Sequence, residues 1–224
     1  MRKANIATLT GLAALLLLPA LAFGKLSETG LTRAQMQASN GMPLTPSCPN
    51  NPCLAVSRTT GFQIKVGAER NMFVVPRSGS IVAWTINLGK PNRRQIAFFN
   101  ANEGGAASAG IAVLRGGRGL SYALRAQSPV VPLEPYFGVN AQFPLATSIP
   151  VRKGDVIALT VPTWAPALAL GFGNDTSWRA SRPKSKCTDT ATQAAQSVIG
   201  QAAQYPCLYR TARLAYSATL ISTP

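Results

Sequence analysis

The chain has 224 residues, with 22 Lys and Arg against 7 Asp and Glu, a formal net charge of +15 and no histidine. The absence of histidine excludes Ser-His-Asp and Cys-His nucleophile pairs and any zinc site that needs an imidazole ligand. Seven scattered acids also disfavour a calcium cage. We therefore expect no metal or other cofactor, and an affinity for polyanionic surroundings.

Residues 1–22 are predicted to be a secretory signal peptide. The positive pair Arg2-Lys3 precedes an apolar stretch, Leu9–Leu18, and Ala20–Ala22 places small residues at −3 and −1 of a cleavage site. An uncleaved membrane anchor is the alternative, but Pro19 interrupts the stretch, and a spanning helix needs about 20 apolar residues. Removing the first two cations leaves 20 Lys and Arg against 7 acids, a net charge near +13.

Residues 23–53 are predicted to be an extended N-terminal arm. Gly41 and several prolines break any regular element there, and the segment ends in the closely spaced Cys48 and Cys53.

From residue 54 onward the chain is predicted to form one β domain, 54–224. Apolar residues alternate with polar ones in short runs divided by Gly and Pro, and Ile81–Leu88 places Trp84 on an apolar, core-facing side. The run Ile96–Phe99 is apolar on both faces, which is typical of a buried central strand. The predicted strands lie within Phe62–Val66, Met72–Val75, Ile81–Leu88, Ile96–Phe99, Ile111–Leu114, Leu120–Ala126, Phe143–Ile149, Val156–Val161, Leu168–Phe172 and Arg210–Ile221.

One helix is predicted, Thr190–Gln204, because this segment is rich in Ala and Gln and follows a capping candidate, Thr188 or Asp189. It lies between Cys187 and Cys207, as an insertion before the last strand.

The four cysteines are predicted to form two disulfides, since an even count in an exported chain favours them. We expect the sequence-local pairing, Cys48–Cys53 and Cys187–Cys207. The rival pairing joins the N-terminal pair to the C-terminal pair. A four-thiolate metal site is the functional alternative, but the second pair is too widely spaced for close ligands.

Strands of this length and spacing predict an all-β, antiparallel β-sandwich of jelly-roll type with one short helical insertion near the C-terminus. The segment Val151–Leu159, a Gly-Asp turn before an apolar strand, resembles the late hairpin of jelly-roll modules such as carbohydrate-binding and C1q-like domains. Across residues 54–221 the chain resembles exported bacterial β-sandwich proteins. The resemblance implies a fold and a compartment, and no binding or catalytic residue is carried over from it.

The densest basic run is the best binding candidate. It comprises Trp178, Arg179, Arg182, Lys184 and Lys186 and ends at a cysteine that would hold it in place. An aromatic ring with charge-assisted donors suits an acidic saccharide or a phosphate-bearing polymer. The alternative is that this run is a solvated loop with no binding role.

Trp164, between two prolines, has two interpretations. It is either a wedge that closes the sandwich, which we favour, or a platform on which a sugar stacks.

Two further patterns give weaker evidence, in this case for catalysis. Paired carboxylates would support glycoside hydrolysis, with Glu103, Glu134, Asp155 and Asp175 as candidates, although Asp155 reads as a turn residue. Ser181 and Lys184 match a Ser-x-x-Lys spacing, but Pro183 lies between them.

The function expected from the sequence is non-catalytic association of an exported domain, secreted or held at the cell envelope, with an anionic cell-envelope polymer or glycan. Nucleic acid is a less favoured partner, and no membrane span is expected after signal removal. The alternatives are a structural or assembly subunit of an extracellular layer and a carboxylate-dependent glycoside hydrolase.

Overall fold

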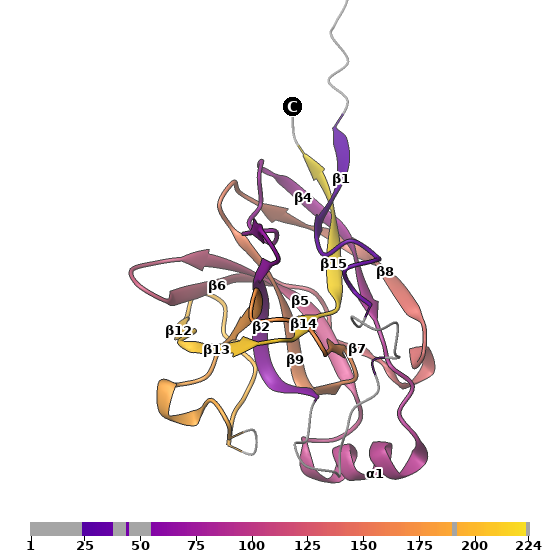
Figure 1. Ribbon diagram of the computed structural model, residues 1–224. Coiled ribbons are helices and arrows are strands. Elements are labelled where there is room, and N and C mark those ends of the chain that lie inside the picture. Colours follow the sequence, from indigo (N-terminus) through magenta and orange to yellow (C-terminus); the bar gives the residue numbers. More distant parts are fainter. Residues whose placement is uncertain (1–23, 38–43, 45–54, 190–191, 223–224) are drawn as a thin grey trace, which may run out of the picture.

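The computed structural model describes residues 24–37, 44, 55–189 and 192–222, and its strands form two main antiparallel sheets (Figure 1). The small sheet has the strand order β1, β15, β4, β8. Its strands are β1 (Lys25–Gly30), β4 (Gly79–Asn87), β8 (Asn140–Val151) and β15 (Tyr216–Ser222).

The large sheet has the order β12, β6, β5, β9, β2, β11, β13 and curls along its width. Its strands are β2 (Val56–Val66), β5 (Ser108–Gly116), β6 (Ser121–Gln127), β9 (Val156–Ala165), β11 (Thr176–Ala180), β12 (Ala202–Gln204) and β13 (Cys207–Arg210). The two-residue strands β3 (Glu69–Arg70) and β7 (Val131–Pro132) pair with β2 and β5, and β10 (Leu168–Ala169) pairs with β14 (Arg213–Leu214).

The core lies between these sheets, and Tyr216 of β15 connects them. Its ring stacks on Phe73 with a centroid separation of 4.3 Å. Its hydroxyl is buried and donates to the carbonyl of Ile157 on β9 at 2.9 Å. Burial raises the pKa of this hydroxyl well above its ordinary value, because the phenolate is disfavoured away from water. The predicted all-β sandwich is confirmed, and Trp84, 1% exposed, lies in the core as expected.

The Gly-rich hairpin is also confirmed. β5 and β6 pair in antiparallel register, and the Gly117 N–H donates to the Ser121 carbonyl across the turn at 2.8 Å. The structure adds two short 3₁₀ helices, η1 (Glu134–Tyr136) and η2 (Lys184–Lys186).

The prediction of a buried strand at Ile96–Phe99 is wrong, because these residues lie in the helix α1 (Arg93–Asn102). Asn92 caps the helix by accepting from the Gln95 N–H, and the Gln95 side chain accepts from the Asn92 N–H in return. This reciprocal capping box starts a helix whose Phe99 faces the core. The Asn-x-x-Gln spacing was the available signal, and the compact apolar run obscured it.

The predicted helix Thr190–Gln204 is likewise not formed in its described part, 192–204, which is irregular before β12. The Gln196 N–H donates to Thr60 Oγ1 at 3.0 Å, and its side-chain amide donates to the Gln201 carbonyl at 2.8 Å. Gly200 has a φ of 85°, which an α-helix does not allow. Long-range contacts have therefore replaced the local helical preference.

The described part of the predicted arm belongs to the folded domain. All six residues of β1 pair with β15, and Leu31 and Met36 are buried. Cys48, Cys53 and the predicted signal peptide 1–22 lie outside the described residues. Among the residues that are described, no helix combines the length and the apolar composition needed to cross a bilayer.

Candidate functional site

The predicted disulfide between Cys187 and Cys207 is confirmed, with an S–S distance of 2.00 Å. Cys187 directly follows the basic run, so the disulfide ties the end of that run to the start of β13. The hydroxyl of Tyr209 donates to the Cys187 carbonyl beside it, which further fixes this segment against β13.

Both candidate tryptophans are buried. Trp164 has no exposed surface: it stacks on Phe99 with a centroid separation of 4.5 Å, and its Nε1 donates to Asn100 Oδ1 at 2.8 Å. Trp178 is 4% exposed and stacks on Tyr209 at 4.4 Å. Neither ring offers a face to a sugar, so the favoured wedge interpretation of Trp164 fits the structure and the stacking role of Trp178 does not.

The two candidate arginines donate hydrogen bonds to other groups of the protein. Arg179 Nη1 donates to the carbonyls of Tyr205 and Pro206 at 3.1 and 3.2 Å. Arg182 is 5% exposed; Nη2 donates to the Ser57 carbonyl at 2.6 Å and Nη1 to the Tyr209 hydroxyl at 2.8 Å. Both guanidinium groups thus donate within the protein and tie β11 and the short segment after it to neighbouring strands and turns.

The two candidate lysines, in contrast, are exposed. Lys186 forms an ion pair with Asp189, Nζ to Oδ2, at 3.1 Å. Hydrogen bonds from Thr192, and then from Lys186, lower the pKa of the Asp189 carboxyl to about 2. Lys184 is exposed at the start of η2 and is the predicted site residue that stands free to meet a ligand.

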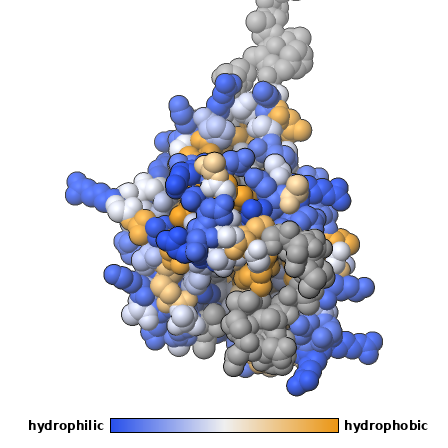
Figure 2. Space-filling model, viewed as in Figure 1, coloured by the Kyte–Doolittle hydropathy of each residue, from blue (hydrophilic) through white to orange (hydrophobic). Residues whose placement is uncertain are grey.

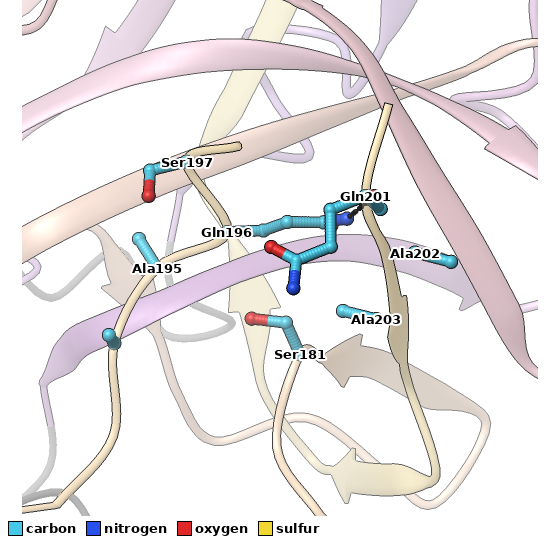
Figure 3. A pocket seen from close by; sticks show the side chains of 8 residues that line it. Ser181, Ala195, Gln196, Ser197, Gln201, Ala202 and Ala203 are labelled. Carbon is cyan, nitrogen blue, oxygen red and sulfur yellow. Dashed lines mark hydrogen bonds between the residues drawn. The ribbon is translucent and has the colours of Figure 1, made fainter. Parts of the chain in front are cut away.

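Lys184 lines one part of a surface groove that the sequence did not predict, which we name the Ser181 groove. One hollow, of about 560 Å³, is lined by Ser181, Pro183, Lys184, Ala203, Gln204 and Pro206. A second, of about 180 Å³, is lined by Ser181, Ala194, Ala195, Gln196, Ser197, Gln201, Ala202 and Ala203 (Figure 3). The hollows share Ser181 and Ala203 and therefore adjoin.

The groove offers hydroxyl and amide groups for hydrogen bonding. The side chains of Ser181 and Gln201 both project into the smaller hollow (Figure 3). Ser181 Oγ accepts from the Thr60 N–H at 3.0 Å and lies 3.4 Å from Thr59 Oγ1, and neither partner is a base.

The carboxylates proposed for glycoside hydrolysis do not line either hollow. Asp155 is buried and accepts from Arg115 Nε at 2.8 Å and from the Arg152 N–H at 2.8 Å, as a turn residue does. Within the described ranges, no three His, Cys, Asp or Glu side chains gather as metal ligands would.

Hydrophilic side chains cover much of the face shown in Figure 2. All 20 cationic residues after residue 22 are described, and fourteen of them are exposed. These are Lys25, Arg33, Arg70, Arg77, Lys90, Arg93, Arg94, Arg118, Arg125, Arg152, Lys153, Lys184, Lys186 and Arg210. Two of the seven acids, Glu103 and Asp155, are buried, so most exposed cations have no acid to neutralise them.

No family model, no curated protein and no solved structure matches this chain. The candidate function therefore rests on the groove and on the distribution of charge.

Proposed function

We propose that this protein is an exported, non-catalytic domain that associates with an anionic polymer or glycan of the cell envelope. The observation that carries the proposal is the excess of positive charge at the surface. Fourteen cationic side chains are exposed, whereas the chain has seven acids and two of these acids are buried. Such a surface attracts polyanions over distances of about a Debye length, about 8–10 Å at moderate salt.

The Ser181 groove is the place where this attraction would become a specific contact. Lys184 supplies a cation at the groove, and Ser181, Gln201 and Gln204 supply hydroxyl and amide groups. Carboxylate or phosphate groups and sugar hydroxyls match these donors and acceptors. The buried Trp178 and Arg182 and the partly buried Arg179 shape the groove's surroundings and do not contact the polymer.

The test is retention on immobilised heparin and on isolated cell wall over a salt gradient. We expect the unmodified protein to bind at low salt and to elute as ionic strength rises, since exposed charge pairs are screened. The double variant Lys184→Gln/Lys186→Gln should elute at lower salt than the control Arg93→Gln/Arg94→Gln. The control removes the same charge from α1, which is distant from the groove in Figure 1.

Flow-through of the unmodified protein at low salt would overturn the proposed function. Equal elution of the two double variants would instead overturn the assignment to the groove, because the charge removed would then matter and its position would not.

A further inference from the structure

The end of the small sheet where β1 begins is defined by one row of paired residues. Lys25 lies opposite Ser222, Ser222 opposite Gly79, and Gly79 opposite Val151. The turns before β4 and after β8 are joined here, because the Lys153 N–H donates to Ser78 Oγ at 3.1 Å. Segments from four parts of the sequence thus meet at this end, at the top of Figure 1.

Four exposed cations lie at this end, and we name them the cationic end. They are Lys25, Arg77, Arg152 and Lys153.

The acids near the cationic end do not cancel its charge. Asp155 is 2% exposed and its carboxylate is held by Arg115, at 2.8 and 2.9 Å, and by the Arg152 N–H. Glu28 is exposed and lies two residues after Leu26 on the same face of β1, where it accepts from Ser217 Oγ at 3.1 Å and Thr219 Oγ1 at 2.5 Å. Among the described residues of this end, four exposed cations therefore outnumber the exposed acid Glu28, and the net charge is positive.

Two exposed apolar side chains adjoin these cations. Leu26 is 64% exposed, Ile221 is 39% exposed, and they lie directly opposite each other in the β1–β15 register. Directly opposed residues of an antiparallel pair project from the same face, so the two side chains form one apolar patch. Ser80 and the exposed Pro150 continue this row across β4 and β8.

From this arrangement we infer that the cationic end and its apolar pair seat on the surface of an anionic lipid bilayer. Lysine and arginine attract acidic headgroups, while Leu26 and Ile221 enter the boundary between headgroups and acyl chains. A soluble polyanion would engage the cations and leave the apolar pair in water, whereas a bilayer satisfies both.

This surface is separate from the Ser181 groove, since β12 lies well away from the start of β1 in Figure 1. The inference goes beyond the proposed function, and either stands if the other fails.

The experiment measures partitioning of the chain that begins at Phe23, the form left by the predicted cleavage, onto phosphatidylcholine vesicles with and without phosphatidylglycerol. Every form therefore lacks the apolar stretch Leu9–Leu18, which would bind the vesicles by itself. We expect Arg152→Gln/Lys153→Gln to weaken partitioning onto the anionic vesicles by about tenfold, because each interfacial cation contributes appreciably. The control Arg93→Gln/Arg94→Gln should weaken it by less than about twofold.

A fluorescent reporter then tests which side chains meet the lipid. The native tryptophans, Trp84, Trp164 and Trp178, are at most 4% exposed, so a tryptophan introduced by Ile221→Trp dominates any change in emission. We expect its emission to shift to the blue on anionic vesicles. Val139→Trp is the control, because Val139 is 50% exposed and precedes β8 at the opposite end of the small sheet.

Three results would overturn the inference. They are equal partitioning of the two double variants, an unchanged Ile221→Trp emission on bound vesicles, and an equal blue shift with soluble heparin. The last would assign this end to a polyanion instead of a membrane. Loss of heparin retention by the lysine variant of the groove would leave the inference untouched.

Discussion

At the residue scale, side chains whose chemistry suggests binding are largely used for packing. Trp164, Trp178 and Arg182 are all at most 5% exposed, and each has a defined partner inside the fold. Arg182 Nε is buried without a hydrogen-bond partner among the described residues, yet two other guanidinium nitrogens are bonded. A dense basic run in a sequence therefore does not establish a cationic surface, because guanidinium groups also serve as donors to backbone carbonyls.

Trp164→Ala is expected to destabilise the protein by about 3–5 kcal/mol, because a fully buried aromatic side chain is lost and a cavity remains. The ring also stacks on Phe99, and Asn100 Oδ1 loses the Nε1–H donor. Urea or guanidinium denaturation followed by circular dichroism measures the change.

Trp164→Phe is the matched control, since it keeps an aromatic ring against Phe99 and removes the donor to Asn100. We expect a smaller loss, about 1–3 kcal/mol, and unchanged retention on heparin. Loss of heparin retention in a stably folded Trp164→Phe protein would contradict a purely structural role for Trp164.

At the element scale, the sequence predicted strands well where polar and apolar residues alternate between turn residues. β2, β4, β6 and β9 follow such patterns, and the β5–β6 hairpin follows its glycines. β1 escaped prediction because its pattern is inverted: Leu26 is exposed, whereas Thr29 is buried.

The helices were misplaced for a related reason. α1 begins at a capping box, but the apolar run that follows the box has a pattern typical of a strand. Residues 192–204 are held by contacts to β2 and β6, which no local sequence pattern indicates. The Ser181 groove was equally beyond local patterns, because Ser181 and Ala203 meet only when the large sheet curls.

Gly79 tests the pairing of the small sheet. A methyl group at this position would lie 2.1 Å from the Ile221 carbonyl oxygen and 2.8 Å from Ser222 Cα, both backbone atoms. The Gly79→Ala variant must therefore separate β4 from β15, and we expect a loss of about 1–3 kcal/mol in thermal or chemical unfolding.

Gly116→Ala is the control for this prediction. Its added methyl group would be 3.7 Å from Tyr122 Cε1, which is an ordinary contact. We expect a change within about 0.5 kcal/mol. Equal stability of the two alanine variants would contradict the close approach of β4 and β15.

At the scale of the whole molecule, the two ends of the described chain meet in one sheet. β1 pairs along its whole length with β15, although these strands are separated by most of the sequence. Glu28 depends on this pairing, because both of its hydroxyl donors belong to β15. Loss of β1 would uncover an edge of β15 and leave unpaired backbone groups along it.

This pairing limits where an exported chain can be processed without damage to the fold. We predict cleavage after Ala22, which leaves β1 complete because that strand starts at Lys25. Intact-mass measurement of the protein from the envelope or medium of an exporting host should show a chain that begins at Phe23. Replacing the −1 residue in Ala22→Lys should block cleavage and accumulate the longer form, whereas Leu21→Gln, at the tolerant −2 position, should be processed normally. A membrane-bound product with the mass of the full chain would instead support the anchor, and a start beyond Lys25 would contradict the role of β1 in the sheet.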